Sequence, residues 1–163
     1  MFSPALIALA ETVLNEARQK GLRIATAESC TGGLICGLLT EISGSSDVVE
    51  RGFTTYSNEA KSDLLGIPLS VIQDNGAVSE IVARAMAEGA VQHAIAQLAV
   101  AVTGIAGPGG GTPSKPVGLV HIAAAREGHP TLHEEHRFGA IGRTEVRLKT
   151  VRAALELLRR HIR

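Results

Sequence analysis

Apolar residues recur along this chain at two spacings, one typical of helices and the other of buried strands. Helical spacing begins after Ser3-Pro4, where serine can cap a helix and proline suits its first position, and it ends at Gly21. We expect further helices over residues 33–42, 61–65, 79–97 and 143–161. Gly66 and Pro68 can end the second of these, and Ser79 can cap the third.

Mostly apolar segments lie between these helices and predict strands. We expect the strands over residues 22–28, 48–56, 98–102, 117–125 and 131–138. Gly128-His129-Pro130 is typical of a turn, so the last two strands are predicted to pair as a hairpin. This order indicates an α/β fold in three layers, with a mixed β-sheet covered by helices. No internal repeat or long linker divides the 163 residues, so we expect a single domain over residues 1–163.

Composition narrows the classes of function. Hydrophobic residues make up 45% of the chain but aromatic residues only 2%, so the core is expected to be aliphatic. The 16 basic and 16 acidic residues cancel, whereas a nucleic-acid-binding protein usually carries a basic excess. One Tyr, three Phe and no Trp are also too few for a base-stacking surface. We therefore expect no nucleic-acid partner.

Cysteine content and hydropathy bear on the compartment. Cys30 and Cys36 are too few and too close together to form a disulfide framework. No apolar run reaches about 18 residues, so no contact with a membrane is expected. The first residues form a charged amphipathic pattern rather than a signal peptide, and we expect a cytoplasmic protein.

A first candidate site is Glu28-Ser29-Cys30-Thr31-Gly32-Gly33, which joins an expected strand to an expected helix. Ligands of open α/β sheets bind at the carboxyl ends of strands, where a serine hydroxyl can be exposed. The N–H groups after Ser29 could hold a phosphate or a developing oxyanion. The alternative is a tight turn in which Ser29 caps the helix. Cys30 is a second candidate nucleophile, although no neighbouring residue favours its thiolate.

A second candidate site is Tyr56-Ser57-Asn58-Glu59-Ala60-Lys61. It places a phenol, a hydroxyl and an amine within about a turn and a half of helix. A serine nucleophile needs a base, and the pKa of a desolvated lysine can fall far enough for it to serve. The alternative is an exposed helix on which Lys61 is solvated.

A third candidate site is the run rich in glycine and proline from Gly104 to Pro116. It follows an expected strand, and its glycines allow a ligand to approach the backbone closely. It lacks the Gly-Lys-Ser/Thr ending of a P-loop, and Thr112 stands where a dinucleotide fingerprint needs glycine. The alternative is a flexible surface loop, although loops of this length in a compact domain are usually functional.

A fourth candidate is Arg143, at the N-terminus of the last expected helix, with Arg147 one turn later. A cation at a helix N-terminus opposes the helix dipole, and an anionic ligand would relieve that conflict. The alternative is an ordinary solvated arginine.

The histidines do not predict a metal site. His133 and His136 lie three residues apart on an expected strand, which places them on opposite faces. The zinc-binding spacings His-Glu-x-x-His and Cys-x-x-Cys are also missing from the sequence. We therefore expect no metal.

Four segments together are more specific than any one of them. They are Glu28-Ser29-Cys30-Thr31-Gly32-Gly33, Tyr56-Ser57-Asn58-Glu59-Ala60-Lys61, Gly76-Ala77-Val78-Ser79 and Val102-Thr103-Gly104-Ile105-Ala106-Gly107-Pro108. This set resembles the CinA C-terminal family, named for competence- and damage-inducible proteins, over essentially the whole chain. The resemblance implies an amidase that converts nicotinamide mononucleotide (NMN) to nicotinic acid mononucleotide and ammonia, in pyridine nucleotide (NAD) recycling.

Larger relatives in that family add an N-terminal domain similar to molybdopterin-binding proteins and associated with ADP-ribose pyrophosphatase activity. The chain resembles the stand-alone form. Because relatives form dimers, the resemblance also implies a homodimer or a higher homo-oligomer.

The resemblance further implies catalytic roles. The family's nucleophilic serine falls on Ser29 and its activating lysine on Lys61, while Tyr56 and Thr103 match polar residues around the site. Neutral Lys61 would take the proton of Ser29, directly or through Tyr56 or Ser57, and Ser29 would attack the carboxamide carbon. Water would then hydrolyse the acyl-enzyme, with no cofactor.

Substrate contacts are expected at the turn, the glycine-rich loop and the last helix. The residues are Cys30, Thr31, Gly32, Gly33, Ser57, Gly104, Gly107 and Arg143. N–H groups of Thr31-Gly32-Gly33 would stabilise the oxyanion, and the loop with Arg143 would hold ribose and phosphate. The family's arginine usually follows Gly-Asp, whereas Ile141-Gly142 precede Arg143 here.

Two other classes of function stay open. A non-catalytic nucleotide-binding module would hold NMN without releasing ammonia, with Lys61 paired to the phosphate. A damage-response interaction protein, suggested by the family's name, would present an exposed apolar patch.

Overall fold

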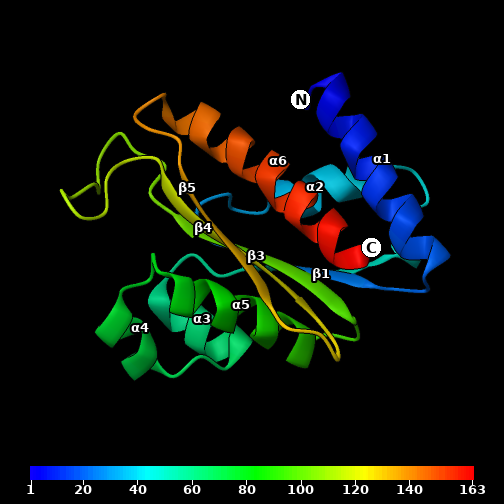
Figure 1. Ribbon diagram of the computed structural model, residues 1–163, viewed down its shortest axis with the longest axis horizontal. Helices are drawn as coiled ribbons and strands as arrows, with labels where there is room; N and C mark the ends of the chain where they lie inside the picture. Colours follow the sequence, from blue (N-terminus) through cyan, green and yellow to red (C-terminus); the bar gives the residue numbers. More distant parts are fainter.

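A five-stranded sheet runs through the middle of the computed structural model, which describes all 163 residues (Figure 1). Its strands are β1 (Ile24–Glu28), β2 (Val49–Thr54), β3 (Leu98–Gly104), β4 (Leu119–Arg126) and β5 (Leu132–Arg137). Their spatial order is β2-β1-β3-β4-β5. The first three are parallel, and the β3–β4 and β4–β5 pairs are antiparallel. The predicted mixed sheet and the predicted hairpin are therefore confirmed.

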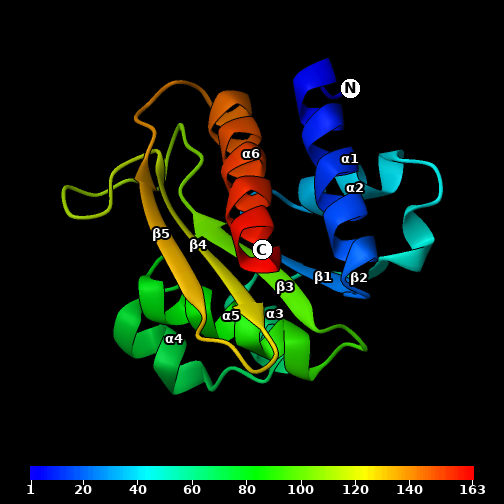
Figure 2. The same cartoon turned by 45° about the vertical axis from the view of Figure 1, so that its right-hand side comes forward.

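Helices cover both faces of this sheet, which gives three layers (Figures 1 and 2). One face carries α1 (Pro4–Gln19), α2 (Leu34–Glu41) and α6 (Arg143–Ile162). The other carries α3 (Asn58–Leu65), α4 (Leu69–Asn75) and α5 (Glu80–Gln92), and a short 3₁₀ helix covers Ser45–Asp47. The α/β fold class predicted from the sequence is correct. None of these helices combines the length and apolar character that crossing a bilayer requires.

Residues of β3 divide the core between the two faces. Leu98, Val100 and Val102 pack with α1, α2 and α6, whereas Ala99 and Ala101 pack with α5. Alanines on the second face leave room for α5 to lie close to the sheet. The expected aliphatic core is thus confirmed, and its halves differ in side-chain size.

Helix boundaries differ from the predictions in one half of the chain. The helix expected over residues 79–97 ends at Gln92, because His93 caps it through backbone and ring contacts with the Gly89 carbonyl. Helix α4 was not predicted, since it has only seven residues and no side-chain cap. The shorter α5 brings the chain back to the start of β3.

Helix α3 lies against α5 through a glycine. A Cβ at Gly89 would overlap the carbonyl oxygen of Leu65, the last residue of α3. This close approach fixes the height of α3 above the sheet, and with it the position from which Lys61 reaches inward.

Candidate active site

Ser29 occupies the turn that joins β1 to α2, at the carboxyl end of the parallel strands. Glu28, the last residue of β1, pairs with Val102 of β3, and the Ser29 N–H donates to the Val102 carbonyl at 3.1 Å. On the other side, the Thr55 N–H donates to the Glu28 carbonyl at 2.9 Å. Ser29 is therefore held between two neighbouring strands, where ligands of α/β sheets bind.

Lys61 of α3 points into this edge of the sheet and meets Ser29. Its Nζ lies 3.1 Å from the Ser29 Oγ, and the lysine is only 1% exposed. Three residues separate β2 from α3, and the last of them, Ser57, caps the helix by accepting from the Ala60 N–H. Lys61, one turn inside the helix, thus lies directly above the end of β1.

Carbonyl groups orient the amine of Lys61. Its Nζ donates to the backbone oxygen atoms of Thr55, Tyr56 and Ser57, at 2.9, 3.3 and 3.4 Å. A neutral amine has two protons for these acceptors and one lone pair for a hydroxyl donor. The arrangement can therefore direct that lone pair at Ser29.

Burial changes the acidity of two neighbouring groups in opposite senses. Desolvation lowers the pKa of Lys61, because the charged ammonium loses its hydration. The same effect raises the pKa of the Cys30 thiol to about 12. Cys30 therefore stays a thiol at neutral pH, and the geometry favours Ser29 as the nucleophile.

The turn after Ser29 presents free N–H groups. The Gly32 N–H donates to the Ser29 carbonyl at 3.0 Å, whereas those of Cys30, Thr31 and Gly33 donate to no other residue. Gly32 and Gly33 have φ values of 59° and 101°, which only glycine adopts readily. The turn can thus offer hydrogen bonds to a negatively charged oxygen.

Glu28 closes the N-terminus of α2 to outside anions. Its buried carboxylate accepts from the Thr31 hydroxyl at 2.5 Å and from the N–H groups of Ile35 and Cys36 at 2.9 and 2.8 Å. A carboxylate is stabilised at that end of a helix. No role was predicted for Glu28 from the sequence, because it belongs to a strand and lies six positions before the first residue of α2, too far for a local capping signal.

Arg147 of α6 binds the turn after Ser29 from the outside. Its Nε donates to the Cys30 carbonyl at 3.0 Å, and its Nη2 donates to the Thr31 carbonyl at 3.1 Å. The sequence placed Arg147 one helical turn after Arg143, but its target lies more than a hundred residues away. Only the packing of α6 on the sheet brings the two together.

Arg143, Tyr56 and Gly107 meet beside this turn. The Arg143 Nη1 donates to the Gly107 carbonyl at 2.8 Å, and its Nη2 donates to the Tyr56 phenol oxygen at 3.2 Å. Tyr56 is 63% exposed, so its phenol faces Arg143 and solvent, and only its carbonyl contacts Lys61. The three residues join the end of β2, the glycine-rich loop and α6.

A hollow of about 180 Å³ adjoins Arg143. Its lining residues are Ala106, Pro108, Val117, Ala140, Gly142 and Arg143. Gly107 lies at its rim with a φ of 81°, and a Cβ there would lie 2.6 Å from Val117 Cγ1. Glycine at this position therefore lets the loop pack closely beside the arginine.

Thr103 and Gly104, at the end of β3, contact neighbouring segments of the fold. The Thr103 hydroxyl donates to the Ala77 carbonyl at 2.8 Å, which ties the segment before α5 to the sheet. A Cβ at Gly104 would lie 2.7 Å from Val120 Cγ2 on β4. Thr103 is thus brought to the site's edge, but its hydroxyl contacts neither Ser29 nor Lys61.

The histidines lie away from the Ser29 turn. His133 and His136 face opposite sides of the sheet, as predicted, since His133 meets Glu80 of α5 and His136 stacks on Phe138. His133 also stacks with His121, and the His121 Nδ1 lies 2.9 Å from the His133 Nε2. No cluster of three His, Cys, Asp or Glu side chains suited to a metal ion is present.

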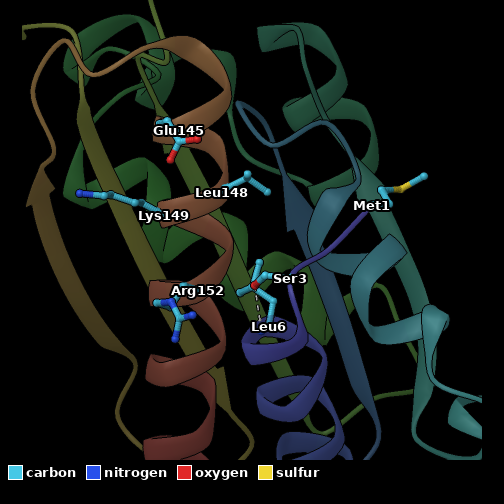
Figure 3. A pocket seen from close by; sticks show the side chains of 7 residues that line it. All are labelled: Met1, Ser3, Leu6, Glu145, Leu148, Lys149 and Arg152. Carbon is cyan, nitrogen blue, oxygen red and sulfur yellow. Dashed lines mark hydrogen bonds between the residues drawn. The ribbon is translucent and has the colours of Figure 1, made fainter.

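The larger hollows of the surface are remote from this chemistry. One of about 270 Å³ lies between the start of α1 and α6, and Figure 3 shows its lining by Met1, Ser3, Leu6, Glu145, Leu148, Lys149 and Arg152. Another, of about 280 Å³, lies between α5 and the β4–β5 hairpin. Because neither contains Ser29 or Lys61, the candidate site is defined by its side-chain geometry rather than by cavity size.

Comparison with known proteins places this arrangement in a family. The sequence model of the CinA C-terminal domain matches residues 6–162. A "CinA-like protein" of Syntrophus aciditrophicus is 51% identical over 144 residues, which are 88% of this chain and 34% of that protein. The curated relatives that the chain matches are longer, and it spans about a third of their length.

Solved structures agree with this match. The competence/damage inducible protein CihA from Agrobacterium tumefaciens is 54% identical, with a TM-score of 0.95 over 97% of this chain and 96% of its own. The competence damage-inducible protein A from Klebsiella pneumoniae is 34% identical, with a TM-score of 0.90 over 95% of each chain.

Proposed function

The chain belongs to the CinA C-terminal domain family, and on that premise we propose that it is an amidohydrolase that converts NMN to nicotinic acid mononucleotide and ammonia. The observation that carries the proposal is the 3.1 Å contact between the Lys61 Nζ and the Ser29 Oγ. A serine hydroxyl beside a desolvated lysine is an activated nucleophile of the kind that forms acyl-enzymes. Hydrolysis of a carboxamide needs such a nucleophile and a group that protonates the departing amine.

The reaction follows from the contacts of Lys61. The neutral amine takes the Ser29 proton directly, and the Ser29 Oγ attacks the carboxamide carbon. Lys61, now an ammonium held by the carbonyls of Thr55 and Tyr56, returns the proton to the amide nitrogen, which leaves as ammonia. Water, deprotonated by Lys61, then cleaves the ester and releases Ser29. The direct contact supports a path without a relay through Tyr56 or Ser57.

The negative oxygen formed in both steps needs donors. The N–H groups of Cys30 and Thr31 are free and follow the nucleophile directly in the chain. Preorganised donors of this kind can contribute about 10²–10³ in rate each. We assign the oxyanion to this pair, with the Gly33 N–H as a neighbour on the same turn.

Arg143 supports recognition of the nucleotide phosphate. Its guanidinium lies at the edge of the site, between Tyr56 and the glycine-rich loop, and carries no carboxylate partner. Arginine suits phosphate because its planar fork can donate two parallel hydrogen bonds. On binding NMN, Arg143 would exchange its contact with the Tyr56 phenol for a charge-assisted hydrogen bond to the phosphate.

Incubation of the purified protein with NMN, with ammonia as the readout, tests the proposal. Turnover that persists in EDTA and is lost in the Ser29→Ala variant is the expected result. NMN binding without ammonia release would instead favour a nucleotide-binding module, in which Lys61 serves only as a cationic contact. Binding by calorimetry, measured on the same samples, separates the two.

A further inference from the structure

The turn after Ser29 is held by its carbonyl groups, and this fixes the direction of its N–H groups. In a trans peptide the C=O of one residue and the N–H of the next point in opposite directions. The bonds of this turn are trans, since the only cis peptide joins Gly107 to Pro108. A group that binds the carbonyl of one residue therefore orients the N–H of the following residue away from itself.

Two contacts set the two donors assigned to the oxyanion. The Ser29 carbonyl accepts from the Gly32 N–H, which fixes the Cys30 N–H. The Cys30 carbonyl accepts from the Arg147 Nε at 3.0 Å, which fixes the Thr31 N–H. The first contact lies within the turn, whereas the second comes from α6.

The contact with Arg147 orients the Thr31 N–H toward the side of the turn on which Lys61 lies. Helix α6 lies on one face of the sheet, and α3, which carries Lys61, lies on the other (Figure 1). An N–H that points away from Arg147 therefore points toward the side from which Lys61 reaches Ser29. The Thr31 N–H, which has no acceptor within the protein, is left free on that side.

We propose that Arg147 is a positioning residue that aims the Thr31 N–H at the oxyanion, an inference that rests on the proposed amidohydrolase reaction. Its second arm donates to the Thr31 carbonyl at 3.1 Å, so one guanidinium holds two successive peptide groups. A Cβ at Gly32 would lie 3.3 Å from the Arg147 Nη2, so the guanidinium lies close against the turn. The side-chain hydrogen bonds of Arg147 go to Cys30 and Thr31, and none goes to Lys61 or to Arg143.

A lysine at this position would hold the two carbonyls less rigidly, because its ammonium is a point charge on a flexible stem and lacks the planar fork of arginine. The chain also offers a matched control on the same helix. Arg152 is exposed, forms only a loose ion pair with Glu156 of α6 itself, and does not contact the turn. Its loss removes the same charge from α6 without releasing a peptide group.

The experiment compares Arg147→Met, Arg147→Lys and Arg152→Met with the wild type. For each, kcat and KM for NMN, the pH dependence of kcat, and the melting temperature are measured. A fluorophosphonate probe adds a second readout, because attack by the Ser29 Oγ displaces fluoride and forms a phosphonyl-enzyme whose oxygen needs the same N–H donors. This reaction does not depend on NMN recognition.

We expect Arg147→Met to lower kcat and the rate of fluorophosphonate labelling by about 10–100-fold, part of what a full oxyanion donor contributes. KM should stay within about two-fold, and the midpoint of the pH profile should stay in place because the Ser29–Lys61 contact is untouched. Arg147→Lys should recover part of the rate, and Arg152→Met should match the wild type. If Arg147→Met does not fold, Arg147→Lys carries the same comparison.

Two results would overturn the inference. A raised KM with unchanged kcat and unchanged labelling would make Arg147 a substrate contact. Full kcat and labelling in both Arg147 variants would show that the turn holds its own shape. If NMN is not a substrate, the labelling rates still decide the role of Arg147. A wild type that is neither labelled nor active would refute the proposed function itself.

Discussion

The Nζ of Lys61 lies 3.1 Å from the Oγ of Ser29, and both residues are buried. Both atoms are held from behind, Ser29 by β3 and Lys61 by three carbonyl groups of the segment between β2 and α3. The pair is thus arranged for proton transfer before a substrate arrives.

Replacing Ser29 with alanine should remove nearly all ammonia release from NMN, while NMN binding stays within a few-fold. Cys30→Ala should keep most of the activity, because burial holds that thiol protonated and it acts as a small apolar side chain. Steady-state kinetics with calorimetric binding checks both. An active Ser29→Ala variant beside an inactive Cys30→Ala variant would transfer the chemistry to sulfur.

Lys61→Met should lower kcat by about 10²–10⁴, the range typical of a lost acid–base group. In the wild type, kcat should rise with pH as the amine loses its proton, with a midpoint below 10.5 because burial lowers the pKa of Lys61. Lys61→Arg is the matched control, since it keeps the positive charge but cannot deprotonate. A Lys61→Arg variant that follows the wild-type pH profile would rule Lys61 out as the base.

Arg143→Ala should impair NMN far more than nicotinamide riboside, which lacks the phosphate. A charge-assisted hydrogen bond contributes about 1.5–3 kcal/mol, or roughly ten- to 150-fold in kcat/KM. Tyr56→Phe is the companion variant, because it removes the phenol contact of Arg143 but leaves the guanidinium in place. Equal losses of activity on both substrates in Arg143→Ala would leave the arginine with a structural role.

The His121–His133 pair should make the fold less stable in mild acid. Burial lowers the pKa of both imidazoles from the usual 6.5, against the opposing charges of Glu80, Glu134 and Glu135. Between the lowered value and 6.5 the unfolded chain binds more protons, so this stability is fully present above about pH 6.5 and is lost as pH falls below it.

Thermal melts at about pH 7.5 and about pH 5.5 measure this loss, at roughly 2–4 °C for each kcal/mol in a chain of this size. In His121→Gln the drop in melting temperature should be smaller than in the wild type. The residual drop is assigned to His161, the pKa of which burial also lowers. An unchanged drop would mean that the pair does not govern the acid response.

Local sequence signals predicted the strand-to-helix turn at Ser29 well, because an apolar strand followed by Gly32-Gly33 leaves few other conformations. They also placed Lys61 in a short helix, although that helix begins at Asn58 and not at Lys61 as predicted. What spacing could not supply was the meeting of the two residues, which lie 32 positions apart and come together through the parallel pairing of β1 with β2. Only the family resemblance joined them in advance.

The other features that the sequence did not predict also depend on contacts that local sequence patterns do not reveal. Glu28 looks like a strand residue, but it becomes a helix cap because its side chain turns toward α2. Thr103 is a polar residue at a strand end, and its hydrogen bond to the Ala77 carbonyl, 26 positions away, has no local signal in the sequence. Helix α5 stops at Gln92 because His93 caps it, which the continuous alanine-rich pattern did not reveal.

Because Arg147 holds the Ser29 turn from the last helix, the proposed activity depends on the order in which the chain is synthesised. A ribosome adds residues from the N-terminus, and Arg147 follows Cys30 by 117 positions. While α6 is still inside the exit tunnel, the carbonyl groups of Cys30 and Thr31 would lack their contact with the guanidinium. A nascent chain would therefore hold its serine in an unfinished turn, and the reactive centre would be completed only when the last helix emerges and packs onto the sheet.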